Sequence, residues 1–182
     1  MSIPYFIADT HWGHKNICQY RPFDSPEIHN KLILDNIVYK VDKRDTLWLL
    51  GDIFFDAELA KDIMDELSYI RNIRWILGNH DGENTERQSI VSEALSRGWK
   101  VYSMFSYKGF WLSHAPIHSL ELRGKPNIHG HVHDKTIPDR DYINVSCENT
   151  SYAPVSLTKI QDTLEFHREY MDKEHSVSLR SC

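Results

Sequence analysis

The sequence has few cysteines and no long apolar run. Its three cysteines, Cys18, Cys147 and Cys182, share no short spacing. An odd and scattered set argues against a disulfide framework and is typical of a reducing compartment, so we expect a cytoplasmic protein. No window approaches the roughly eighteen consecutive apolar residues of a membrane span. The first residues, Met1 to Pro4, also lack the basic and apolar regions of a signal peptide.

Clustered positive charge is missing as well. The chain has 182 residues and a formal net charge of -5. Long nucleic acids are bound by grouped Lys and Arg side chains, so this composition gives no support to such a partner. A small anionic substrate stays compatible, because bound cations can reverse the local field. The length predicts one domain over residues 1–171, followed by a frayed tail over residues 172–182.

Short apolar runs alternate with helical patterns in the first half of the chain. The predicted strands are Ile3–Ala8, Thr46–Leu50 and Ile73–Leu77. Helices are predicted over residues 25–41, 56–69 and 86–97, with Ser25 and Asp56 as N-caps. This order predicts parallel βαβ units.

The first of these helices has a clear apolar stripe. Its 3.6-residue period is carried by Ile28, Leu32, Ile33, Asn36 and Ile37. Two polar residues, His29 and Lys31, lie off the stripe, so we expect them to be solvated.

After Trp99 the pattern changes to short aromatic segments. Residues 101–102, 104–107 and 110–113 read as strands, and Lys108-Gly109 resembles a hairpin turn. Further strands are expected within residues 127–133 and 142–147, and a closing helix over residues 155–170. These features predict a second, mostly antiparallel sheet. The aromatic run from Phe105 to Trp111 is expected to pack in the core, because no basic stripe accompanies it as in a base-stacking surface.

The chain is unusually rich in histidine, with eleven residues, and several follow predicted strands in the company of Asp or Asn. Carboxyl ends of strands are where α/β proteins bind ligands. The polar residues at these positions are Asp9, His11, Asp52, Asn79, His80, His114, His131 and His133. Without His80, a candidate acid, seven candidate ligands remain. Mixed imidazole and carboxylate ligands suit Mn²⁺, Fe²⁺, Zn²⁺ or Ni²⁺ rather than Ca²⁺. One catalytic zinc takes about three protein ligands, so seven indicate two metals that share a carboxylate.

The ordered motifs resemble the calcineurin-like metallophosphoesterases. They read Asp-x-His, Gly-Asp, Gly-Asn-His-Asp, His and Gly-His-x-His, and extend over residues 3–157. The segments at residues 9–14, 21–23, 144–146 and 152–155 are similar to the small, single-domain bacterial and phage-type branch. The resemblance implies a four-layer α/β/β/α fold, in which two mixed β-sheets are flanked by helices.

The resemblance also implies roles for the polar residues. Asp9, His11 and His133 would hold one metal, Asn79, His114 and His131 would hold the second, and Asp52 would bridge both. His80 would stabilise the developing charge or protonate the leaving oxygen, and Asp81 would orient His80. The cofactors would be two divalent transition-metal ions, with Mn²⁺ the first choice and Fe, Zn or Ni the alternatives. A metal-bridging hydroxide would attack phosphorus in line.

Several polar residues near these motifs have two interpretations. His14 would contact the leaving group or pack on Trp12. Arg21 would bind a substrate phosphate or carboxylate, or make a surface contact. Asp81 would alternatively be a turn residue. The other histidines are expected outside the ligand set: His118 at the surface or as a support of the site, His129 as a support behind it, and His167 and His175 in solvent.

These features favour a hydrolase of a small phosphorylated substrate. A chain this short has no room for a cap domain, so the site is expected to be open, which favours a phosphodiester or nucleotide over a phosphomonoester. Two other classes stay open. A non-catalytic scaffold would be expected to lose ligands, and a nuclease for short single-stranded ends would need a basic path to the site. The composition predicts neither an oligomeric state nor a pathway.

Overall fold

The first sheet is formed mainly by the N-terminal half of the chain, and its four parallel strands end at the same edge. The computed structural model describes residues 2–165. Strands β4 (Lys100–Tyr102), β3 (Asn72–Ile76), β2 (Thr46–Leu50), β1 (Pro4–Ile7) and β9 (Val155–Ser156) lie in this order. Strands β4, β3, β2 and β1 run parallel to one another, and β9 is antiparallel to β1. The predicted βαβ units are therefore confirmed.

The second sheet contains β5 (Met104–Tyr107), β6 (Phe110–Ser113), β7 (Asn127–His129) and β8 (Tyr142–Asn144) in chain order. Only β5 and β6 are antiparallel, while β6, β7 and β8 run parallel to one another. The prediction of a mostly antiparallel sheet is wrong, because the long connections after β6 and β7 allow crossovers that a hairpin does not. The β5–β6 turn is as predicted, since Lys108 and Gly109 both have positive φ.

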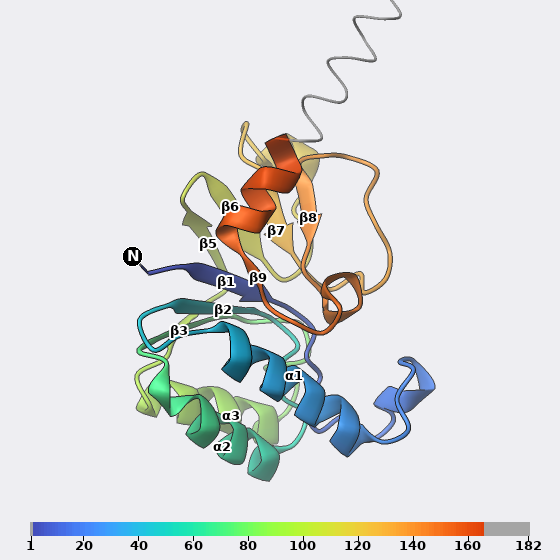
Figure 1. The fold of residues 1–182 in the computed structure, drawn as a ribbon, viewed down its shortest axis with the longest axis vertical. Coiled ribbons are helices and arrows are strands. Elements are labelled where there is room, and N and C mark those ends of the chain that lie inside the picture. Colours follow the sequence, from blue (N-terminus) through green and yellow to red (C-terminus); the bar gives the residue numbers. More distant parts are fainter. Residues whose placement is uncertain (1, 166–182) are drawn as a thin grey trace, which may run out of the picture.

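Helices cover both outer faces of the two sheets (Figure 1). Helices α1 (Pro26–Lys40), α2 (Ala57–Glu66) and α3 (Thr85–Ser96) lie on one face of the first sheet. Residues 157–165 form a helix beside the second sheet. Short 3₁₀ turns are η1 (Ile17–Gln19), η2 (Leu67–Tyr69), η3 (Ser119–Glu121) and η4 (Cys147–Thr150). This arrangement confirms the predicted α/β/β/α layers.

The N-cap side chains of α1, α2 and α3 each accept a backbone hydrogen bond at the start of their helix. Ser25 and Asp56 accept from Ile28 and Leu59, as predicted for caps. Among the described residues, no helix has the length and apolar character needed to cross a bilayer. The predicted tail over residues 172–182 lies outside the described residues, together with His167 and His175.

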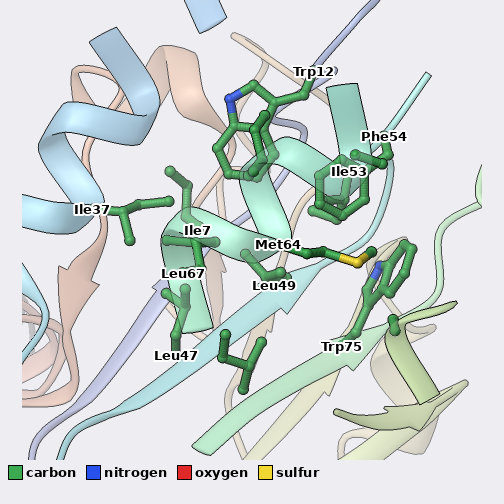
Figure 2. Close-up of a cluster of buried hydrophobic side chains, with 14 of the residues drawn as sticks. Ile7, Trp12, Ile37, Leu47, Leu49, Ile53, Phe54, Met64, Leu67 and Trp75 are labelled. Carbon is green, nitrogen blue, oxygen red and sulfur yellow. The ribbon is translucent and has the colours of Figure 1, made fainter. Parts of the chain in front are cut away.

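Strand β2 is buried on both faces, because it lies between two hydrophobic cores. Leu47 and Leu49 face the helices, where they lie in one cluster with Met64 of α2 and Leu67 of η2 (Figure 2). The alternate residue Trp48 faces the second sheet. There its ring centroid lies 5.4 Å from that of Phe105 and 5.1 Å from that of Tyr107, so the aromatic run packs in the core as predicted. This continuous burial explains why β2 reads as an uninterrupted apolar run.

The buried face of α1 agrees with the predicted stripe only in part. Ile33 and Ile37 are buried as predicted, whereas Ile28 and Leu32 are 52% and 39% exposed and His29 is buried instead. His29 is therefore not solvated. Its Nε2 lies 2.8 Å from Nη1 of Arg21 and its Nδ1 lies 3.0 Å from Oδ1 of Asn30. Burial lowers the pKa of His29 to about 4, so the neutral ring accepts from the guanidinium and donates to the amide.

Candidate metal centre

The predicted ligands lie where strands of both sheets end. Asp9 and Asp52 follow the parallel strands β1 and β2, and Asn79 follows β3. His114 comes directly after β6, and the Gly130-His131 turn follows β7. Backbone hydrogen bonds connect these ends, from Asp9 N to Gly51 O and from Gly130 N to His114 O, at 3.0 Å and 2.8 Å. Side chains distant in sequence are thereby brought to one edge.

The first group of candidate ligating side chains contains Asp9, His11 and His133. One ligand atom of each lies within 4.8 Å of the others. Oδ1 of Asp9 and Nε2 of His11 are 4.0 Å apart, and both are buried without a hydrogen-bond partner. Burial, assisted by the charge of Arg21, lowers the pKa of His11 to about 2. Two buried lone pairs without donors are costly, so these atoms fit a bound cation.

The second group contains Asp52, His114 and His131, and Asn79 lies beside it. Nε2 of His114 lies 3.3 Å from Oδ2 of Asp52, 3.2 Å from Nδ1 of His131 and 3.0 Å from Oδ1 of Asn79. Burial lowers the pKa of His114, but the nearby Asp52 carboxylate outweighs this and raises it to about 9. Asp52, Asn79 and His131 thus each place an oxygen or nitrogen atom within 3.3 Å of Nε2 of His114, and a proton and a divalent cation would compete for this cluster.

Asp52 contacts both groups, the second through its carboxylate and the first through its backbone oxygen. Its carboxylate belongs to the second group, and its Oδ1 also accepts from the backbone N–H of His80 at 2.9 Å. Its backbone oxygen accepts from the N–H of His11 in the first group at 3.1 Å. The carboxylate itself is not part of the first group, so its bridging role stays a prediction.

The backbone around the candidate ligands is held in an uncommon conformation. Positive φ values occur at five of the seven positions: Asp9 (56°), His11 (50°), Asp52 (54°), His131 (73°) and His133 (52°). The left-handed region costs free energy for residues other than glycine and is concentrated at functional sites. The surrounding hydrogen bonds therefore hold these side chains in positions that an unstrained turn would not give.

Two glycines of the motifs are required by close approach to the carboxylates. A Cβ atom on Gly78 would overlap Oδ1 of Asp52, and one on Gly130 would overlap Oδ2 of Asp9. Because glycine has no side chain, the turns that contain Gly78 and Gly130 can pack directly against these carboxylates. This is a physical reason for glycine before Asn79 and before His131.

Asp81 supports Asp52 rather than His80. Its buried carboxylate accepts from the backbone N–H groups of Asp52, Ile53 and Gly78 at 2.9, 2.9 and 2.7 Å, and from Nε1 of Trp75 at 3.1 Å. Nδ1 of His80 is instead 2.9 Å from Oε2 of Glu83. The predicted orientation of His80 by Asp81 is therefore wrong, because Asp81 is occupied in joining the turns after β2 and β3.

Arg21 and Glu148 form a buried support beneath the first group. Arg21 is 2% exposed, and its Nη2 donates to the backbone oxygen of Asp9 at 2.7 Å. Its guanidinium also pairs with Oε1 of Glu148 at 2.8 Å, and that oxygen lies 3.0 Å from Nδ1 of His133. This burial does not fit the predicted substrate contact or a surface contact of Arg21. Pairing with His133 and Arg21 outweighs burial and lowers the pKa of Glu148 to about 2.

Sequence reasoning missed two side chains of this support. Glu148 follows the Asn144-Val145-Ser146 segment, but no motif indicated its contact with His133. Ser146 is buried and donates from its hydroxyl to Oδ2 of Asp9 at 2.7 Å. The only available signal was the likeness of that segment to the phage-type branch.

The remaining histidines lie at different depths. The ring centroid of His14 is 5.8 Å from that of His11 and 4.9 Å from that of Phe55, so His14 borders the first group. Its predicted contact with a leaving group stays a prediction. His118 is exposed and caps η3. His129 is buried behind the site, with Nδ1 2.9 Å from the oxygen of Gly130.

Comparison with known proteins agrees with the resemblance of the motifs. Residues 5–169 match the family model described as calcineurin-like phosphoesterase. An uncharacterized protein of Methanocaldococcus jannaschii is 34% identical over 172 residues, which cover 88% of this chain and 90% of that protein. The gene 66 protein of Mycobacterium phage L5 is 30% identical, with 77% and 82% covered. The crystal structure of a protein of unknown function from Aquifex aeolicus has a TM-score of 0.67 and 25% identity, and covers 90% of this chain and 100% of that chain.

Proposed function

Because the chain belongs to the calcineurin-like phosphoesterase family, we propose that it hydrolyses a small phosphodiester or nucleotide with the help of two divalent metal ions. Metal-dependent cleavage of a phosphoester is supported by the family together with the two groups of ligating side chains. The observation that carries the proposal is the adjacency of these groups at one edge of the two sheets. The dinuclear site and the diester preference are the parts that need an experiment.

The donor atoms suit transition metals. Imidazole nitrogens and carboxylate oxygens are mixed in both groups, and this mixture favours Mn²⁺, Fe²⁺, Zn²⁺ or Ni²⁺, of which we propose Mn²⁺. Asp9, His11 and His133 would hold one ion, and Asn79, His114 and His131 the other, with Asp52 between them. When bound, such ions polarise phosphoryl oxygens and lower the pKa of the attacking water.

The chain's own residues leave one side of the centre open to a substrate. Asn79 and His131 are exposed, and the side chain of His80 is 38% exposed. We assign the substrate to this side, where the imidazole of His80 would stabilise charge on the phosphoryl group or protonate the leaving oxygen. An open rim leaves room for groups on both ester oxygens of a phosphodiester, which supports the diester over the monoester.

Parallel hydrolysis assays of bis-p-nitrophenyl phosphate and p-nitrophenyl phosphate test this proposal. Each substrate is measured with added Mn²⁺, with EDTA, and with the Asp52→Asn variant. Asp35→Asn is a matched control, because that carboxylate is exposed and its one ion pair in the described part of the chain is with Lys31. Faster metal-dependent cleavage of the diester supports the proposal. Faster cleavage of the monoester makes the protein a phosphomonoesterase, and cleavage of neither by metal-loaded protein favours a binding scaffold.

A further inference from the structure

His80 is held at three points, and these leave one ring nitrogen free. Its backbone N–H donates to Oδ1 of Asp52 at 2.9 Å, and its backbone oxygen accepts from Nη1 of Arg87 at 3.2 Å. Its Nδ1 is 2.9 Å from Oε2 of Glu83. No described residue makes a hydrogen bond to Nε2. Because a carboxylate only accepts, the contact with Glu83 places a proton on Nδ1 and presents Nε2 to the substrate.

Glu83 is itself fixed by Arg87 at the start of α3. Nη1 of Arg87 lies 2.7 Å from Oε2 of Glu83. Asn84, the N-cap of α3, accepts from the backbone N–H of Arg87 at 3.0 Å, which holds this turn in place. The side chain of Arg87 is 15% exposed and that of Glu83 is 53% exposed, so the guanidinium is sheltered while the carboxylate borders solvent.

Arg87 also reaches the first group of ligating side chains through an aromatic ring. Its Cζ lies 4.0 Å from the centroid of Phe55, a distance typical of a cation–π contact. The ring of Phe55 stacks on His11 with centroids 4.7 Å apart and an interplanar angle of 19°. One arginine therefore connects the candidate acid to a candidate metal ligand.

We propose that Glu83, fixed by Arg87, is the positioning residue that directs Nε2 of His80 toward the leaving oxygen of the substrate. This inference rests on the proposed phosphoester hydrolysis. As water adds to phosphorus and loses a proton to solvent, the bond from phosphorus to the leaving oxygen breaks. Its electron pair goes to that oxygen, which takes the proton from Nε2. The ring keeps its Nδ1 proton toward Glu83 and regains the Nε2 proton from solvent.

The chain contains a matched control for this arrangement. Glu93 and Arg97 form the same i,i+4 pair at the other end of α3, with Nε of Arg97 2.7 Å from Oε1 of Glu93. Arg97 otherwise pairs with Asp65 on α2. Replacing Glu93 therefore removes the same charge and the same kind of ion pair without touching His80.

The first test compares two leaving groups with the Mn²⁺-loaded enzyme. Phosphodiesters with p-nitrophenyl and phenyl leaving groups are cleaved by wild type, Glu83→Ala, Glu83→Gln and Glu93→Ala. Proton donation matters more for the poorer leaving group, phenol. Glu83→Ala is expected to slow release of phenol about tenfold more than release of p-nitrophenol, in line with the effect of orienting partners. Glu83→Gln keeps an acceptor and is expected to restore part of the difference, and Glu93→Ala is expected to match wild type.

Equal losses for both leaving groups in Glu83→Ala, or the same loss in Glu93→Ala, would overturn the inference. A second readout, the ¹⁵N NMR shifts of the His80 ring, does not depend on turnover. A protonated Nδ1 in wild type that is lost in Glu83→Ala supports the positioning contact, and an unprotonated Nδ1 in wild type refutes it. Wild type that cleaves neither ester would refute the proposed hydrolysis, while the NMR result would still decide whether Glu83 orients His80.

Discussion

Replacing Glu148 with glutamine should weaken one metal site selectively. Its carboxylate is 16% exposed and joins Nδ1 of His133 to the guanidinium of Arg21. A glutamine side chain would keep the volume but lose the charge. A hydrogen bond to a charged group contributes about 1 kcal/mol more than a neutral one, and orienting partners of metal ligands affect affinity by roughly 10–100-fold. We therefore expect Mn²⁺ to bind roughly tenfold more weakly at the group of Asp9, His11 and His133.

Isothermal titration of the metal-free protein with Mn²⁺ measures this effect. The ion at the group of His114 and His131 should keep its affinity, because the hydrogen bonds and ion pairs of Glu148 among the described residues go to Arg21 and His133. Glu121→Gln is the matched control, since Glu121 is exposed and, within residues 2–165, forms an ion pair only with Arg123. Unfolding curves of each variant verify that the fold is retained. A folded Glu148→Gln variant that binds both ions like wild type, or loses both equally, would refute the reasoning.

Three other substitutions test separate parts of the account. His29 has a folded pKa of about 4 against 6.5 for the free group; its contribution to stability is present above pH 6.5 and is lost as the pH falls toward 4. Between pH 7 and pH 5, the unfolding free energy of wild type, measured with denaturant, should therefore fall by about 2 kcal/mol more than that of His29→Gln. Gly78→Ala should destabilise the fold by about 1–3 kcal/mol through overlap with Asp52, whereas Gly82→Ala, with open space around it, should not. His80→Ala should slow hydrolysis about 10²–10⁴-fold and retain its metal content, measured by elemental analysis.

Each of these expectations has a contrary result. An unchanged pH dependence in His29→Gln would mean that this imidazole is not the group that titrates. Equal stability of the two glycine variants would remove the close approach at Asp52. Loss of metal from His80→Ala would make His80 a ligand.

Local sequence signals predicted most of the candidate ligands. A buried run followed by glycine and polar residues, as at Leu77-Gly78-Asn79, marks a strand end whether or not its partners are known. The parallel strands then bring such ends together at one edge. The N-caps Ser25 and Asp56 were predictable for the same reason, because a cap is decided within about one turn of helix.

Long-range contacts decided what the sequence could not predict. In α1, Ile33 lies inside as predicted, but Ile28 and Leu32 are exposed. His29 is buried instead, where Arg21 lies against it. The contacts of His133 with Glu148 and of His80 with Glu83 likewise depend on where two turns meet. The strand directions of the second sheet follow from crossovers whose path no local pattern shows.

Crystals grown with Mn²⁺ and measured at the manganese absorption edge test the central claim most directly. Two anomalous peaks about 3.5–4 Å apart are expected. One would lie among Asp9, His11 and His133, and the other among Asn79, His114 and His131, with the Asp52 carboxylate in contact with both. A single peak, or an Asp52 carboxylate that contacts only one ion, would contradict the dinuclear centre.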